Sequence, residues 1–195
     1  MFGHKLATRS ADAGPVAYTL VFRRPKAADG PAVSGLIGDC PPLDENSRYC
    51  NLLQCSDFAD TCVLVEDATG DGRRPLGWVS AYRRPREPQT LFVWQVAVHP
   101  DARGAALGRR MILSLLARQA CSGVTAVKTT VTPDNHASRA LFCKLAADLG
   151  APMEERLHFD RQRHFEDRHE SERLITIGPL RATAIARATN HRGPA

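Results

Sequence analysis

The sequence has 195 residues, a formal net charge of +5, and 43% hydrophobic and 24% charged residues. A chain of this length can bury one well-packed core but is short for two domains. No apolar run is long enough to span a bilayer, and the N-terminus lacks the pattern of a secretory signal. The six cysteines form no Cys-x-x-Cys pair, which argues against structural zinc and a disulfide framework. We therefore expect a cytoplasmic protein that binds no metal.

The positive charge does not indicate nucleic-acid binding. The basic residues are not interleaved with aromatic residues, as they would be on a surface that binds single strands. Several of them (Arg103, Arg109 and Arg110) cluster in a glycine-containing loop, where a phosphate-rich ligand would account for them. We predict that neither nucleic acid nor a membrane is a partner.

The order of periodic segments predicts one folded domain over residues 17–180. Residues 1–16 and 181–195 lack apolar periodicity and are expected to be flexible extensions. Strands are expected over 18–23, 61–66, 76–82, 90–98, 126–131, 156–160 and 172–177. Helices are expected over 29–37, over 46–55, from 107 to a terminating Gly123, and over 135–149. We expect Asp44 or Asn46 to cap the second helix, and Pro85 and Pro88 to lie in a loop.

The segment from Phe92 to Met111, FVWQVAVHPDARGAALGRRM, is the most informative part of the chain. An apolar strand runs into a Pro-Asp turn, a loop of small residues and an amphipathic helix. Small residues let the backbone approach a bulky anion, and the first N–H groups of a helix lie at the positive end of its dipole. The segment therefore predicts a pyrophosphate-binding loop, formed by Arg103, Gly104, Ala105, Ala106, Leu107, Gly108 and Arg109. A tightly packed structural turn is the alternative.

A second segment follows the strand 126–131. Asn135 stands at the start of a helix, with Ser138 and Phe142 three and seven residues further on. Asn135 can hydrogen-bond a ligand, or it can serve only as a helix cap. In order and separation, the two segments resemble the acetyl-CoA-binding motifs of the GCN5-related N-acetyltransferases.

This resemblance implies the GCN5-related N-acetyltransferase fold, an α/β (α+β) architecture with a mixed central sheet of six to seven strands flanked by about four helices. It also implies acetyl-CoA as cosubstrate, bound by the loop, by Asn135 and Phe142, and by the strand backbone at Val96, Ala97 and Val98. The backbone N–H groups there would polarise the thioester oxygen. Phe142 lacks the hydroxyl with which the Tyr of many relatives protonates the departing thiolate.

Longer strings are more specific: LDENSRYCNLL, FVWQVAV, TTVTPDN followed by ASRALF, and HESE followed by IGP. From about Phe22 to Pro179, the chain resembles the diaminobutyrate acetyltransferases of ectoine biosynthesis. The resemblance implies acetyl transfer from acetyl-CoA to the 4-amino group of L-2,4-diaminobutyrate, a role in osmotic stress, and a homodimer.

The substrate of that reaction carries two ammonium groups, so its site needs carboxylates, and the attacking amine must lose a proton. Asp44 and Glu172 are the candidate carboxylates, as the resemblance also suggests. Tyr49 is expected about one helical turn from Asp44, and Trp94 is expected to form a wall of the pocket. Glu172, His169 or a water between them would accept the proton, and Tyr49 is a further catalytic candidate.

Each of these residues also has a plainer interpretation. Asp44 could be only a helix cap, Trp94 only a core residue, and Glu172 only a solvent-facing residue. His169, with His158 and His164, matches no zinc spacing.

Two other functions stay open at this point: acetylation of another small amine or of a protein N-terminus, and a non-enzymatic acyl-CoA-binding regulator. An assay of acetyl transfer to diaminobutyrate, ornithine and lysine would discriminate between them.

Overall fold

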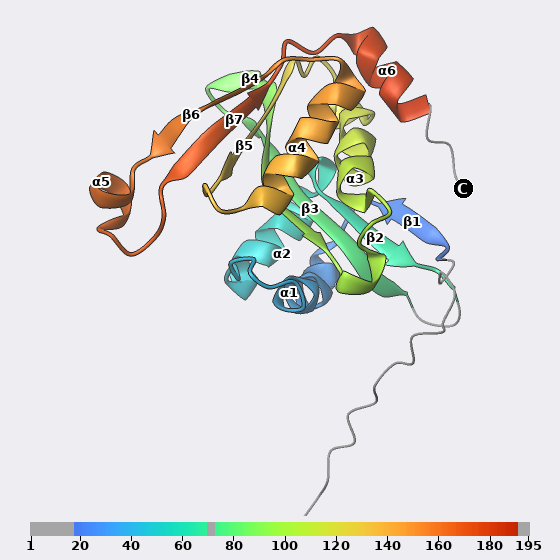
Figure 1. Cartoon of the computed structure of the whole chain (residues 1–195). Coiled ribbons are helices and arrows are strands. Elements are labelled where there is room, and N and C mark those ends of the chain that lie inside the picture. Colours follow the sequence, from blue (N-terminus) through green and yellow to red (C-terminus); the bar gives the residue numbers. More distant parts are fainter. Residues whose placement is uncertain (1–17, 70–72, 191–195) are drawn as a thin grey trace, which may run out of the picture.

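The computed structural model describes residues 18–69 and 73–190, and a mixed seven-stranded sheet runs through it (Figure 1). The strand order is β1-β2-β3-β4-β5-β7-β6. Of the described strand pairs, β4 and β5 are parallel and the others are antiparallel. The strands are β1 (Leu20–Arg23), β2 (Val63–Asp67), β3 (Arg74–Arg84), β4 (Glu87–Val98), β5 (Ala126–Val131), β6 (Met153–Phe159) and β7 (Glu172–Ile177). The predicted mixed sheet of six to seven strands is confirmed.

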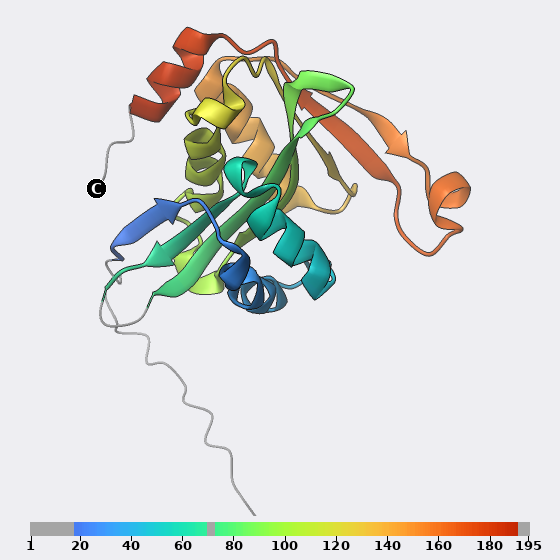
Figure 2. The same cartoon turned by 180° about the vertical axis from the view of Figure 1, so that it is seen from behind.

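Helices cover both faces of the sheet. Figures 1 and 2 show α1 and α2 on one face and α3 and α4 on the other. The helices are α1 (Gly30–Gly38), α2 (Arg48–Ser56), α3 (Leu107–Leu116), α4 (His136–Leu149), α5 (Arg161–Phe165) and α6 (Ala182–Asn190). The short helix α5 lies at the end of the β6–β7 arm, and α6 lies beside α3 and α4.

Each face has its own core. Under α3 and α4 the buried side chains include Met111, Ile112, Leu115 and Leu145. Under α1 they include Val33, Leu36 and Ile37, which pack with Trp78 of β3. Neighbouring residues of β3 contribute to opposite cores, Trp78 to one and Val79 to the other, because successive side chains of a strand point to opposite faces. The sheet is therefore buried on both sides.

Three local predictions differ from the structure. Ser47, rather than Asp44 or Asn46, caps α2: its hydroxyl accepts a hydrogen bond from the Cys50 N–H at 3.1 Å. Pro88 lies inside β4, where a register shift leaves it without an opposite residue on β3, so its missing N–H breaks no ladder bond. Helix α3 ends at Leu116, and a short 3-10 turn separates it from Gly123.

The C-terminal segment also differs from the expected flexible tail, because α6 covers Ala182–Asn190. Ala188 is buried and Ile185 packs against the same core. These two residues lie three positions apart and share one helix face, an apolar stripe too short to stand out among small residues and arginines. The predicted extension 1–16 and residues 191–195 lie outside the described residues.

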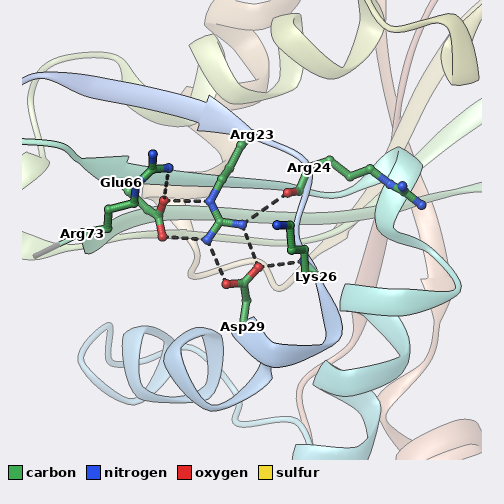
Figure 3. A network of polar contacts seen from close by, with 6 residues as sticks. All are labelled: Arg23, Arg24, Lys26, Asp29, Glu66 and Arg73. Carbon is green, nitrogen blue, oxygen red and sulfur yellow. Dashed lines mark hydrogen bonds and ion pairs between the residues drawn. The ribbon is translucent and has the colours of Figure 1, made fainter.

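An arginine at the edge of the sheet joins three elements (Figure 3). Arg23 of β1 donates to Glu66 of β2 through Nε and Nη2, both at 2.7 Å, and to both carboxylate oxygens of Asp29 at 2.7 and 2.8 Å. Asp29 directly precedes α1, and Glu66 is only 5% exposed. The Arg23 guanidinium holds the pKa of both carboxyls below their ordinary values. This network fixes the start of α1 against the sheet.

We expect Arg23→Met to lower the free energy of unfolding by about 2–4 kcal/mol, because it removes the short hydrogen bonds to Asp29 and Glu66 and leaves the buried Glu66 carboxylate with the longer pair to Arg73 at 3.4 Å. The lowered pKa of Asp29 and Glu66 makes this contribution complete above about pH 4.5 and progressively lost as the pH falls through the lower folded-state values. Urea denaturation of both proteins at about pH 7 and about pH 3 measures the difference.

Arg24→Met is the matched control. The ion pair of Arg24 with Asp60 has both side chains at least 60% exposed, so its loss should cost less than about 1 kcal/mol. Equal losses for the two variants would contradict a structural role for the Arg23 network.

Candidate active site

The candidate site lies where the two halves of the sheet separate. The parallel pairing of β4 with β5 runs only from Thr90↔Ala126 to Phe92↔Lys128. Beyond it, β4 continues along β3 as far as Val98, while β5 continues along β7 as far as Val131. Figure 1 shows the resulting divergence. The backbone of 93–98 therefore has no strand partner on the β5 side, which leaves N–H and C=O groups for an extended ligand.

Trp94 lies at a β-bulge in β4. Ser80 of β3 is opposite Gln95, and Ala81 is opposite Val93, so Trp94 has no opposite residue. Its side chain is 49% exposed, and its ring packs edge-on against Tyr82 at 6.4 Å between centroids. The plainer interpretation of Trp94 as a core residue does not fit this exposure. The ring can serve as a wall of an open pocket.

The predicted phosphate loop connects the end of β4 to the start of α3. Gly104 and Ala106 both have positive φ angles, +86° and +55°, which turn the chain sharply into the helix. The first helical hydrogen bond runs from the Arg110 N–H to the Ala106 oxygen. The N–H groups of Leu107, Gly108 and Arg109 therefore have no acceptor within the helix. Donors at the positive end of a helix dipole suit a pyrophosphate.

Several predicted cofactor residues place their side chains in the core. Leu107 and Phe142 are both 2% exposed, so Leu107 can offer a ligand only its backbone. A Cβ at Gly108 would lie 2.5 Å from Leu141 Cδ1 and 3.4 Å from Val96 Cγ1. The lack of a side chain here lets α3 lie close to α4, since a Cβ would force Leu141 to shift. The packing interpretation of this glycine and the phosphate-binding one are both compatible with the structure.

The polar side chains around the loop already make contacts within the protein. Arg109 pairs with Asp148 of α4 at 2.6 Å, which joins α3 to α4. Arg103 is exposed, and its Nε donates to the Val98 oxygen at 3.3 Å. Asn135 caps α4, since its Oδ1 accepts from the Ser138 N–H at 3.0 Å. The Asn135 Nδ2 group is left for a ligand, so capping and binding do not exclude each other.

Three of the predicted acceptor-site residues come together from distant parts of the chain. His169 Nε2 lies 3.9 Å from Asp44 Oδ2. The charges of both act on Glu172, whose pKa is raised, mainly by burial and also by Asp44, although a Thr130 hydrogen bond and His169 oppose the shift. The Glu172 Oε2 atom is buried and has no hydrogen-bond partner among the described residues. The plainer interpretation of Glu172 as a solvent-facing residue does not fit these observations.

The tautomer that His169 has when neutral follows from its other ring nitrogen. Nδ1 lies 2.7 Å from the Glu170 carbonyl oxygen, which can only accept, so Nδ1 carries the hydrogen. In the neutral imidazole, Nε2 is then a hydrogen-bond acceptor that faces the Asp44 carboxylate. The carboxylates of Asp44 and Glu172 thus present hydrogen-bond acceptors beside His169, as a site for an ammonium group requires.

The structure does not bring Tyr49 into this group. Asp44 precedes α2, which begins at Arg48, so the two residues do not share a helix as expected. Tyr49 is 69% exposed, and among the described residues no hydrogen bond, ion pair or ring contact joins it to Asp44, His169 or Glu172.

Two further residues were missed by the sequence analysis. Gln95 donates through Nε2 to the main-chain oxygen of Asp44 at 2.8 Å, and its Oε1 accepts from Asn46 Nδ2 at 3.0 Å. Thr130 of β5 hydrogen-bonds Glu172. Gln95 could have been noticed in the sequence, because it is a polar residue within the apolar strand that ends at Val98.

Within 18–69 and 73–190, no group of three or more His, Cys, Asp or Glu side chains is arranged to hold a metal ion. In the same ranges, no helix combines the length and the apolar character that a membrane span needs.

Comparison with known proteins agrees with this geometry. Residues 33–146 match the model of the acetyltransferase (GNAT) family. A protein of Bordetella parapertussis, named L-2,4-diaminobutyric acid acetyltransferase, is 49% identical over 82% of this chain and 84% of its own length. A protein of Methylotuvimicrobium alcaliphilum with the same name is 47% identical over 84% of this chain and 92% of its own length.

A solved structure is also similar. Diaminobutyrate acetyltransferase EctA from Paenibacillus lautus, in complex with L-2,4-diaminobutyric acid and coenzyme A, is 40% identical, with a TM-score of 0.77. The match covers 84% of this chain and 96% of that one.

The match to the family model shows that the chain, with its sheet divided between β4 and β5, belongs to the GNAT acetyltransferases. Within them, identities of 40–49% over most of both chains place it in the family of L-2,4-diaminobutyric acid acetyltransferases.

We expect Ala105→Glu to weaken the binding of coenzyme A at least about tenfold, or about 1.4 kcal/mol, because it puts a carboxylate beside the helix start that would receive the pyrophosphate. Ala105 is exposed and has an ordinary backbone conformation, so the fold should tolerate the change. Isothermal titration calorimetry with coenzyme A measures the dissociation constant.

Ala105→Lys is the matched control, because it adds similar bulk with the opposite charge and should keep or strengthen binding. If both variants bind coenzyme A as the wild type does, the phosphate site lies elsewhere.

Proposed function

We propose that this protein transfers the acetyl group of acetyl-CoA to the 4-amino group of L-2,4-diaminobutyrate, giving N4-acetyl-2,4-diaminobutyrate. The observation that carries the proposal is the pair of acceptor carboxylates, Asp44 and the unpartnered Glu172 oxygen, that come together beside His169. An ammonium group offers three N–H donors to such a pair. The family membership supports the same reaction, since the Paenibacillus lautus relative was solved with both diaminobutyric acid and coenzyme A.

The cofactor side of the proposal rests on the open end of the divided sheet. The backbone of Val96, Ala97 and Val98 would hold and polarise the thioester arm of acetyl-CoA. The loop from Arg103 to Arg109 would hold the pyrophosphate through its N–H groups, and Asn135 Nδ2 would donate to the pantetheine. Phe142 has no proton to give, so the thiolate would leave as such or be protonated by water.

The acceptor side assigns a role to each remaining residue. Asp44 would anchor an ammonium group of the substrate, with Trp94 as a wall. Glu172 would accept the proton of the attacking amine, directly or through His169. Because the pKa of Glu172 is raised, its carboxylate binds a proton more readily than an ordinary one does. The neutral amine would then attack the thioester without a covalent enzyme intermediate.

The cellular setting is a further part of the proposal. Resemblance to the diaminobutyrate acetyltransferases supports a cytoplasmic homodimer that serves ectoine biosynthesis under osmotic stress, with a single acetyltransferase domain over 17–180. Neither nucleic acid nor a membrane is proposed as a partner. Size-exclusion chromatography with light scattering would test the dimer.

We expect Glu172→Gln and Asp44→Asn each to lower kcat/KM for diaminobutyrate about ten- to hundredfold, because each removes a charge-assisted hydrogen bond of about 1.5–3 kcal/mol. Both changes keep the side-chain shape, so the affinity for acetyl-CoA should stay the same. Asp44→Asn should mainly raise KM, whereas Glu172→Gln should mainly lower kcat.

The pH profile separates the two roles further. Only ionised Glu172 can accept a proton, so wild-type kcat should fall as the pH drops through the raised pKa of Glu172, above the ordinary value of 4.5. This acid limb should disappear in Glu172→Gln. Glu170→Gln is the matched control, since Glu170 is exposed and pairs with Arg161 at 2.6 Å. Wild-type kinetics in both site variants would refute the assignment.

A further inference from the structure

Gln95 connects the acceptor site to the strand that would hold acetyl-CoA. Its side-chain amide bridges two parts of the segment before α2, the main-chain oxygen of Asp44 and the side chain of Asn46. A carbonyl oxygen can only accept, so the amide nitrogen must face Asp44 and the amide oxygen must face Asn46. The orientation of the amide is thus determined by its two partners.

We propose that Gln95 is a positioning residue that determines which diamine the enzyme accepts, by fixing Asp44 at a set distance from Glu172. The inference rests on the proposed function and deepens it. Gln95 itself need not touch the substrate. It acts through Asp44, whose main chain it binds.

After Leu43, which packs against the core under α1, the chain that carries Asp44 is exposed. The Asp44 side chain is 91% exposed, so packing does not hold its position. In the part of the chain that the structure covers, the two hydrogen bonds of Gln95 are the ones that join residues 44–46 to the sheet. Leu43 packs against the core under α1, so the loss of these bonds would leave Leu43 in place and free the chain from Asp44 to Asn46 to shift.

The other end of the acceptor site is fixed more firmly. Glu172 is the first residue of β7, which pairs with β5 and β6 on its two sides. Two carboxylates that bind the two amino groups of a diamine select for the distance between those groups only if both carboxylates have fixed positions. Glu172 is held by the sheet, and Asp44 is held by Gln95. The choice between diaminobutyrate and its longer homologues therefore depends on the Gln95 side chain.

Two substitutions separate the bonds of Gln95. Gln95→Glu keeps the shape and the acceptor for Asn46 but loses the donor to Asp44, and it sets a carboxylate oxygen against a carbonyl oxygen. Gln95→Met keeps the length and loses both bonds. Both should free the Asp44 segment, and Gln95→Glu should do so more strongly because of the repulsion.

The experiment compares steady-state kinetics with diaminobutyrate and with ornithine, which is one methylene longer. We expect KM for diaminobutyrate to rise about tenfold in Gln95→Met and more in Gln95→Glu. The preference for diaminobutyrate over ornithine, as a ratio of kcat/KM values, should fall about fivefold or more. KM for acetyl-CoA and the melting temperature should stay at their wild-type values.

Gln89→Glu is the matched control, because Gln89 lies on the same strand, is exposed and stands outside the site. Gln95 variants that keep the wild-type preference overturn the proposal. The proposal is also overturned if the variants raise KM for acetyl-CoA and for diaminobutyrate alike and lower the melting temperature, because Gln95 would then have a general structural role.

Calorimetric binding of diaminobutyrate to the enzyme saturated with coenzyme A provides a readout that needs no turnover. It should weaken in both Gln95 variants and stay unchanged in Gln89→Glu. A wild-type enzyme that neither binds nor acetylates diaminobutyrate would instead refute the proposed function itself, so the two failures can be told apart.

Discussion

The site depends on one interruption in the sheet, the end of pairing between β4 and β5 after Phe92 and Lys128. Close to this point, Glu87 pairs with Lys128 of β5 at 2.5 Å and with Arg84 of β3 at 2.9 Å. These ion pairs hold β3, β4 and β5 together at the end where β4 and β5 are still paired. Because β4 and β5 are parallel, their carboxyl ends lie at the same edge. The phosphate loop follows one of these ends and Asn135 follows the other. A ligand bound between the strands would therefore meet both without any further element.

The two faces of the sheet support the site in different ways. On the α3–α4 face, the phosphate loop is backed by the contact of Gly108 with Leu141 and by the Arg109–Asp148 pair. On the α1–α2 face, the Asp44 segment is held by the hydrogen bonds of Gln95. Packing in a core resists displacement, whereas one or two hydrogen bonds contribute about 0.5–1.5 kcal/mol each. Acceptor choice should thus change more readily than cofactor binding when residues are replaced.

The features that were predictable from sequence are local ones. The turn into α3, the Asn135 cap and the strands that flank them follow from residue types at neighbouring positions. Asp44, His169 and Glu172 were found through resemblance and through the chemistry of a diamine. What could not be predicted depends on contacts between distant residues. The pairing of Arg109 with Asp148 could not be foreseen because Asp148 lies far along the chain. Helix α6 forms because the core under α3 and α4 offers a surface to Ile185 and Ala188. Gln95 was missed for the same reason.

The two carboxylates of the acceptor site lie in different surroundings, and the difference suits their proposed roles. Asp44 is exposed to solvent, so folding has not removed water from its carboxylate, which stays available to bind an ammonium ion. Glu172 is half-buried, and burial disfavours its charged form. An ion pair between Glu172 and an ammonium is poorly solvated, whereas a carboxylic acid beside a neutral amine has no charge to solvate. Burial therefore shifts the shared proton towards Glu172, and the amine left behind is the form that can attack a thioester.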